Sequence, residues 1–423
     1  MSHFHQAVLL ASLSLCNTAA LAQQTTPAPT APAAPIAAPV EDPLQRVIAG
    51  IKRTLEQRPN DPTLYFYLAS FQARAKETQN ALASLRKMHE LGDGFLPGGH
   101  FGFDDLKDNP EFIALRAEIE RKLPVVANAA LAFRISDKGF SPEGIAWDEQ
   151  GKHFYIGSVL QKKVARFTRA GKESVFAGPE SGLQQVLGVA VDGKRRLLYA
   201  VSTNALTNSK PLHNAVFAFD LGNGSKVAEY PVPEARQLND VAISADGDLY
   251  VSDSAAGGIY KITASQKPAA VSAFIPAGTL GGSNGLALSA DGKTLFVAHS
   301  TGMVRVDVAT AKLDRLAPPA RQTISGVDGL YVYKGDLIGI QNLTSPGRVI
   351  RVRLSENGTD IKQVDTLQSH HNKFFLEPTT GAIADDHIHV LTTILPDYTD
   401  KGELENSARM QSATIVKVPL GKP

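Results

Sequence analysis

The sequence is poor in features that mark several classes of protein. Its single cysteine, Cys16, lies near the start of the chain, so the remainder needs no disulfide bonds. The 43 lysines and arginines nearly cancel the 42 aspartates and glutamates, which leaves a formal net charge of +1 at pH 7. No basic cluster with interleaved aromatic residues occurs. We therefore expect no nucleic-acid partner and no electrostatic attraction to membranes.

Familiar catalytic motifs are also missing. The chain has no H-E-x-x-H zinc motif and no phosphate-binding loop. His387 and His389 lie on one face of a predicted strand, but no third metal ligand stands nearby. Beyond the N-terminal stretch, no apolar run is long enough to span a bilayer. We expect no membrane span.

Residues 1–22 predict a secretory signal peptide. An apolar run from Ala7 to Leu15 precedes Ala20-Leu21-Ala22, which has the form of an A-x-A cleavage site. Cys16 could also be read as a lipoprotein acylation site, but Leu15 stands where a small residue is expected. Residues 23–41 are rich in alanine and proline and predict a disordered linker. We therefore expect an exported protein, periplasmic or secreted.

Residues 42–123 predict a small helical domain, because the apolar period there is about 3.6 residues. A first stripe consists of Leu44, Val47, Ile48, Ile51 and Leu55. A helical pair between Pro62 and Gly92 resembles a tetratricopeptide repeat, and a last helix runs from Pro110 to Leu123. One repeat is too few for an independent solenoid. The segment could be a helical cap, a small dimerising module or a docking module for a protein partner.

Residues 131–420 contain six copies of one predicted β-hairpin. In the clearest copy, residues 283–300, apolar residues alternate with smaller or polar ones on both sides of Asp291-Gly292, a tight-turn pair. The other copies begin at Ser141, Leu187, Leu238, Ser325 and Thr379. Equivalent positions recur every 44 to 52 residues. This period predicts a mainly β fold, a six-bladed β-propeller in which the hairpin forms the inner half of each blade.

The residue that opens each inner strand should lie near one mouth of the central channel. These residues are Glu143, Leu187, Asn239, Asn284, Asp328 and Thr380. The ring gathers two carboxylates and two amides with no cation, which suits a hard divalent metal. Without a metal, two close carboxylates would repel and raise one pKa. The alternative is that Asn and Asp before Gly serve only the turn geometry.

Four motifs around these residues resemble those of the senescence marker protein, gluconolactonase and regucalcin family. The motifs are Glu143-Gly144, Leu238-Asn239-Asp240, Ser283-Asn284-Gly285-Leu286 and Val327-Asp328-Gly329-Leu330. The resemblance covers residues 132–418 and implies a six-bladed propeller with a metal at the channel mouth. It implies Glu143, Asn284 and Asp328 as metal ligands, with Asn239 binding water or substrate. It implies Ca²⁺ first among cations, with Zn²⁺, Mg²⁺ or Mn²⁺ as alternatives.

The chain departs from the family pattern at two places. Gln237 stands where family members commonly carry an arginine, with Arg236 one residue earlier, so specificity for sugar lactones is not implied. His299 stands where the family often has aspartate, and we expect a structural role for it. His370 and His371 lie in a predicted loop over the channel mouth and are candidates for substrate binding or accessory acid-base chemistry.

The leading functional expectation is an exported metal-dependent hydrolase of lactones or related esters. Asp328 would be both a metal ligand and the catalytic base, while the cation would polarise the substrate carbonyl. The alternative is a propeller without catalytic activity that binds a ligand or protein partner, with the helical segment as docking module. A third hypothesis is a lyase or arylesterase that uses His370 or His371.

Overall fold

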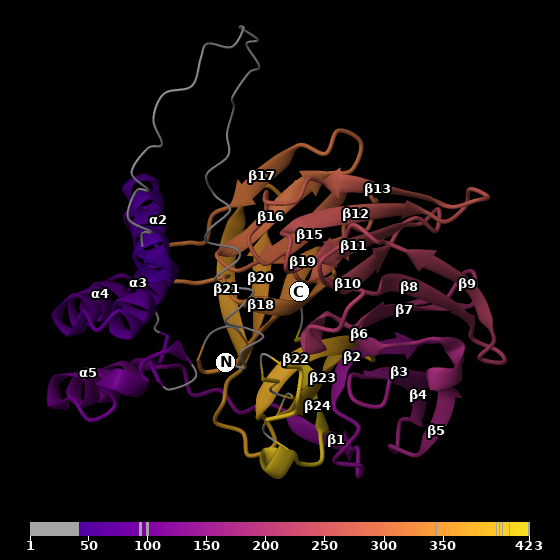
Figure 1. Cartoon of the computed structure of the whole chain (residues 1–423), viewed down its shortest axis with the longest axis horizontal. Coiled ribbons are helices and arrows are strands. Elements are labelled where there is room, and N and C mark those ends of the chain that lie inside the picture. Colours follow the sequence, from indigo (N-terminus) through magenta and orange to yellow (C-terminus); the bar gives the residue numbers. More distant parts are fainter. Residues whose placement is uncertain are drawn as a thin grey trace, which may run out of the picture.

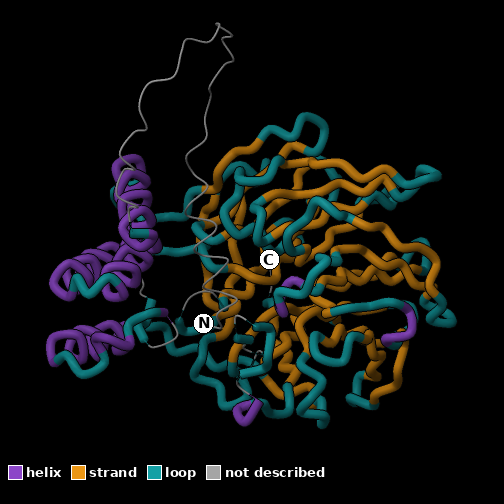
Figure 2. Tube along the Cα trace, viewed as in Figure 1, coloured by secondary structure: helices purple, strands orange, loops and turns teal. Residues whose placement is uncertain are grey.

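The structure is a computed structural model that describes residues 42–421 except 93–94, 99–100, 343–344, 395, 397, 400 and 406. The predicted signal peptide and linker, residues 1–41, lie outside the described residues. The chain forms a small helical unit followed by six four-stranded antiparallel sheets (Figure 1). Figure 2 shows the helices gathered on one side of the ring of strands. Among the described helices, none is long and apolar enough to cross a membrane.

The helical unit contains α2 (Pro43–Gln57), α3 (Pro62–Arg74), α4 (Thr78–Leu91) and α5 (Pro110–Lys122). Three of these helices start at a proline, where the missing N–H is not needed. The preceding Asp42, Asp61 and Asn109 accept hydrogen bonds from the first-turn N–H groups. Short 3-10 turns elsewhere are η2 (Asp104–Leu106), η3 (Pro179–Ser181), η4 (Ala205–Thr207) and η5 (Ser407–Arg409).

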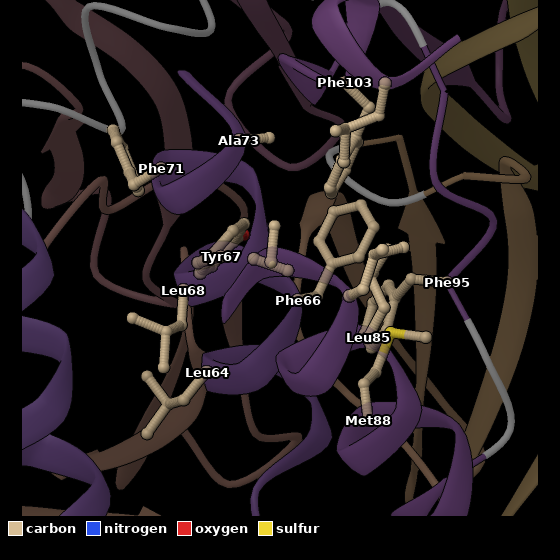
Figure 3. Packing of buried hydrophobic residues seen from close by; sticks show 14 of the residues in the cluster. Leu64, Phe66, Tyr67, Leu68, Phe71, Ala73, Leu85, Met88, Phe95 and Phe103 are labelled. Carbon is tan, nitrogen blue, oxygen red and sulfur yellow. The ribbon is translucent and has the colours of Figure 1, made fainter. Parts of the chain in front are cut away.

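An aromatic cluster forms the core of the helical unit (Figure 3). The ring centroid of Phe66 lies 5.1 Å from that of Phe95, 5.4 Å from that of Phe101 and 5.6 Å from that of Phe103. Such separations are typical of favourable aromatic pairs. The predicted helical region is therefore confirmed, while its tetratricopeptide character stays a prediction.

Each sheet is one blade, and its four strands follow one another in the chain except in the last blade. Blade 1 contains β2 (Pro142–Asp148), β3 (His153–Ser158), β4 (Lys163–Thr168) and β5 (Glu173–Ala177); blade 2 contains β6 (Gln185–Asp192), β7 (Leu197–Thr203), β8 (Asn214–Asp220) and β9 (Lys226–Pro231). Blade 3 contains β10 (Leu238–Ile243), β11 (Leu249–Asp253), β12 (Gly258–Thr263) and β13 (Ala270–Ile275); blade 4 contains β14 (Leu286–Leu288), β15 (Thr294–His299), β16 (Gly302–Asp307) and β17 (Leu313–Leu316). Blade 5 contains β18 (Val327–Tyr333), β19 (Asp336–Gln341), β20 (Arg348–Leu354) and β21 (Ile361–Gln368); blade 6 contains β22 (Glu377–Ala384), β23 (His387–Thr393), β24 (Thr414–Pro419) and β1 (Ala130–Arg134).

The six predicted hairpins are the inner halves of the six blades, as expected. Figure 1 shows β2, β6, β10, β18 and β22 nearer the middle of the ring than β5, β9, β13 and β17. Hydrophobic cores lie between neighbouring blades, as where Tyr155 of blade 1 and Phe217 of blade 2 share one buried cluster. β1 pairs with β24 and closes the ring by joining the two ends of the propeller sequence. Closure leaves no blade without a neighbour.

The helical unit docks on the loops of blades 4 and 5. The Tyr67 hydroxyl donates to Ser300 O at 3.0 Å, and the Thr63 hydroxyl donates to Ser325 Oγ at 2.9 Å. The Leu96 N–H donates to Ser345 O at 2.6 Å. These loops follow a second strand or precede an inner strand, so they lie at the propeller end where the inner strands begin. The predicted ring of polar residues lies at the same end.

Candidate functional site

A local irregularity of the inner strands presents the predicted ring residues. In five of the six blades, the pairing register between the first two strands shifts just where the ring residue lies. In blade 1, for example, Glu143 and Gly144 stand between the pairs Pro142↔Ser158 and Ile145↔Ile156. A bulge bends a strand and redirects a side chain, and bulges are common next to active sites.

A glycine follows the ring residue in five of the six repeats, and at some of these positions neighbouring inner strands approach each other too closely for a side chain. A Cβ atom on Gly144 would lie 2.1 Å from Leu187 O, and one on Gly285 would lie 2.2 Å from Asp328 O. No side chain fits at such distances. The recurring glycines therefore let adjacent blades bring their ring residues together at one level of the channel.

Asp328 is the ring residue whose carboxylate is fixed by hydrogen bonds from two amide side chains. Its side chain is 4% exposed, and its Oδ2 accepts a hydrogen bond from Asn342 Nδ2. The Asn284 side chain also forms a hydrogen bond with Asp328. Asn342 follows β19, and its backbone N–H donates to Gly326 O at 3.1 Å. Two amides therefore orient one carboxylate, and the structure joins the predicted ligands Asn284 and Asp328.

Burial and mutual repulsion perturb the acids of the channel. Burial raises the pKa of Glu143 well above its usual range, and the charges of Asp328 and Asp240 raise it further. Burial raises the pKa of Asp328 to about 7. The hydrogen bond from Asn342 lowers this pKa, whereas the charge of Asp240 raises it. Burial raises the pKa of Asp240 to about 6, although the N–H groups of Leu286 and Val241 oppose the change. The site is an environment that disfavours negative charge unless a cation enters.

Three buried oxygens of the site lack a hydrogen-bond partner. They are Glu143 Oε2, Asn284 Oδ1 and Asn342 Oδ1. An unpaired buried acceptor costs about 1–3 kcal/mol, so three at one place call for a ligand. In the described part of the chain, no three His, Cys, Asp or Glu side chains form a metal cluster. A cation here would use amide oxygens together with two carboxylates, the oxygen set that suits Ca²⁺ or Mg²⁺.

Asp240 is a functional candidate that the sequence analysis did not select. It occupies the glycine position of its repeat, and its Oδ2 accepts from Leu286 N at 2.9 Å. A cavity of about 240 Å³ runs along the inner strands, with Asp240 and Tyr331 in its wall. The Tyr331 hydroxyl accepts from Gly381 N at 2.6 Å. The detectable signal for Asp240 was a carboxylate at a position that is glycine in the other five repeats.

Asn342 was missed for a different reason, because it directly follows the second strand of its blade and does not occupy the repeated ring position. Asn239, which was predicted, is buried, and its Nδ2 donates to Ser254 Oγ at 2.9 Å. Ser254 in turn donates to Ser283 O at 2.7 Å. Asn239 is therefore fixed between blades 3 and 4, and its contact with water or substrate stays a prediction. Two residues before it in the sequence, Gln237 has a buried Nε2 without a partner.

Among the described residues, the predicted histidines form no hydrogen bond or ion pair with the carboxylates of the ring. His370 and His371 lie in the loop between β21 and β22, with 3.9 Å between their ring centroids and an angle of 44° between their planes. Burial, His371 and Arg348 lower the pKa of His370, while Glu120 at the end of α5 opposes this. No described contact joins either histidine to Glu143 or Asp328. His389 packs against Phe154 at 4.8 Å between ring centroids, which is a packing role.

The SMP-30/Gluconolactonase/LRE-like region is the family whose model matches this chain, over residues 141–365. No curated protein matches the chain. A calcium-binding regucalcin from Agrobacterium tumefaciens is similar in structure, with TM-score 0.48 and 16% identity over 71% of this chain and 100% of that one. A gluconolactonase from Xanthomonas campestris has TM-score 0.45 and 16% identity over 68% and 89%. A streptogramin B lyase has TM-score 0.45 and 14% identity over 69% and 97%.

Proposed function

The chain belongs to the SMP-30/gluconolactonase/LRE-like family, and on this premise we propose that it is an exported, metal-dependent hydrolase of lactones or related esters. The observation that carries the proposal is the group of buried oxygens without partners on Glu143, Asn284 and Asn342. The family includes proteins with different activities, so the proposal rests on this site rather than on the fold. The signal-peptide pattern of residues 1–22 supports export.

Glu143, Asn284 and Asp328 would hold a divalent cation, with Ca²⁺ as the first candidate. A cation bound there would supply a Lewis acid that polarises the substrate carbonyl and stabilises the developing oxyanion. Asp328 would accept the proton of the attacking water, because Asn342 and Asn284 already fix its carboxylate. Asn239, anchored by Ser254, would orient water or substrate.

Two long loops support selection of substrate at the mouth. The segments are residues 204–213, between β7 and β8, and residues 394–413, between β23 and β24. Gln185 at the start of β6 accepts from Leu206 N at 3.2 Å and forms a side-chain hydrogen bond with Tyr398. Both loops therefore meet above blade 2. Because binding loops on a rigid scaffold usually set specificity, we expect them to choose among acyl groups.

The test is hydrolysis of a panel of lactones and aryl esters with Ca²⁺, Mg²⁺, Mn²⁺ or Zn²⁺ added after chelation. The variant Asp328→Ala should lose at least a hundredfold in kcat/KM, since it removes both a ligand and the base. Asp192→Asn is the matched control, because Asp192 is also a buried inner-strand aspartate but pairs with Arg195. Full activity in Asp328→Ala would refute the assignment.

A binding protein without catalytic activity is the alternative. It would use the helical unit as docking module, but the aromatic residues of that unit serve internal contacts. Tyr67 is 1% exposed and bonds to the propeller, and Phe71 is fully buried. Metal binding at the ring with no turnover of any substrate in the panel would favour this alternative.

A further inference from the structure

A second cavity, of about 320 Å³, lies between the helical unit and the propeller. One wall is formed by residues 57–63, around the start of α3, and the other by Thr301, Arg315 and residues 317–325, from β17 toward β18. It shares no lining residue with the cavity along the inner strands. One wall precedes residues 141–365, so the matched family region supplies only half of this cavity.

The walls of this cavity carry unbalanced charge. Three arginines line it, Arg58, Arg315 and Arg321, against a single acid, Asp61. Asp61 Oδ2 pairs with Arg58 and lies 3.3 Å from Arg315 Nη2, while its Oδ1 caps α3 by accepting from Thr63 N at 3.0 Å. One carboxylate therefore serves two guanidinium groups and a helix start. Two positive charges of the lining have no counter-charge among the lining residues.

Burial makes this imbalance costly. The Arg58 side chain is 18% exposed, and its Nε is buried without a partner. Burial and the nearby Arg58 charge lower the pKa of Arg315, against the attraction of Asp61. Burial and both arginines lower the pKa of His299 to about 3, so this histidine is neutral. Asp61 already contacts both guanidinium groups and offsets one of their two charges, so a second anion beside them would offset the other.

We propose that this cavity binds a compact oxyanion, a phosphate or carboxylate group, which bridges Arg58 of the helical unit and Arg315 of blade 4. The planar fork of arginine matches the oxygens of either group. Because its two main ligands belong to different parts of the chain, the anion fastens the helical unit to blade 4, whose strands lie between Asn284 and Asp328 in the sequence. The proposal does not depend on the hydrolase activity.

The experiment is calorimetric titration of the purified protein with inorganic phosphate and, separately, with succinate, at constant ionic strength set with sodium chloride. We expect saturable binding of one anion per chain. Arg315→Gln should weaken it at least tenfold, because a charge-assisted hydrogen bond is lost. Arg353→Gln is the matched control: Arg353 is 36% exposed and paired with Asp365, as Arg315 is 38% exposed and paired with Asp61.

Arg58→Gln tests the opposite wall and should weaken binding to a similar extent. Arg315 is half-exposed and its described hydrogen bond is to Asp61 alone, so the Arg315→Gln variant should fold. If the Arg58→Gln variant does not fold, Arg315→Gln alone tests the proposal. Binding of phosphate alone identifies the site as one for phosphate groups, and binding of succinate identifies it as one for carboxylates. No binding of either anion, or affinity unchanged in Arg315→Gln, would overturn the proposal.

Discussion

Replacing Asp328 by asparagine should stabilise the protein without metal and abolish its stabilisation by metal. Asp328 is 4% exposed, and its pKa is raised from 3.8 to about 7 chiefly by burial. An amide at this position keeps an oxygen that accepts from Asn342, but it carries no charge. The substitution therefore removes the unfavourable burial of a negative charge and, at the same time, a strong ligand for a cation.

The size and sign of the change in stability with pH follow from the pKa of Asp328. The folded protein holds the Asp328 proton up to about pH 7, whereas the unfolded chain releases it near 3.8. Stability is therefore lost as pH rises through this window, by roughly 4 kcal/mol at most. Above pH 7 and with chelator present, Asp328→Asn should be more stable than the natural chain by up to about that amount. At pH 4 the two should be nearly equal.

Adding metal should narrow this difference in stability between the two proteins. At one hundred times its dissociation constant, a ligand that binds only the folded state stabilises it by about 2.7 kcal/mol. The natural chain should gain this stabilisation and the variant should not. The single tryptophan, Trp147, lines the inner cavity and reports unfolding by its fluorescence during urea titration.

The control is Asp192→Asn. Asp192 is also buried, but its carboxylate accepts from two backbone N–H groups and pairs with Arg195. Removing that charge should lower stability with or without metal. Our interpretation of the channel fails if Asp328→Asn is not more stable than the natural chain at pH 8 in chelator, or if metal stabilises both equally.

Two further substitutions test the strand packing and the histidine loop. Gly285→Ala should unfold the chain or cost several kcal/mol, because the new Cβ would lie 2.2 Å from Asp328 O, and thermal melting measures this. Gly292→Ala is its control, since that turn glycine has φ 70° and open space around it, and should cost about 1 kcal/mol. The double variant His370→Ala, His371→Ala should keep most of its hydrolytic activity; loss of turnover with unchanged metal binding would instead favour histidine chemistry.

Most of the fold was predictable because its signals are local. An alternating strand, an Asp-Gly turn and a second strand form a hairpin from contacts only a few residues apart, and six such hairpins set the number of blades. Gly292 has the positive φ that the turn requires. The pairing of β1 with β24 was not predictable in this way, because it joins residues at opposite ends of the propeller sequence. The docking of α3 on Ser325 is likewise a contact without a repeat to reveal it.

The candidate site was predictable only where the repeat carried it. Glu143, Asn284 and Asp328 share one position in three repeats, so alignment of the repeats finds them. Asn342 lies outside that position and reaches Asp328 only because β19 pairs beside β18. In the sequence, nothing distinguishes Asn342 from any other loop asparagine. Predicting it requires the register of the two strands, which the bulge between Val327 and Leu330 changes.

The helical unit reaches this site through a short path of hydrogen bonds. Thr63 at the start of α3 donates to Ser325, and Gln341 donates to Ser325 O at 2.7 Å. The next residue, Asn342, holds Asp328. Because each group is buried or partly buried, a shift of α3 would change the position of the Asp328 carboxylate. The helical unit therefore contacts residues next to those that hold Asp328, and an anion that fastens the helical unit to blade 4 would act on the same contacts.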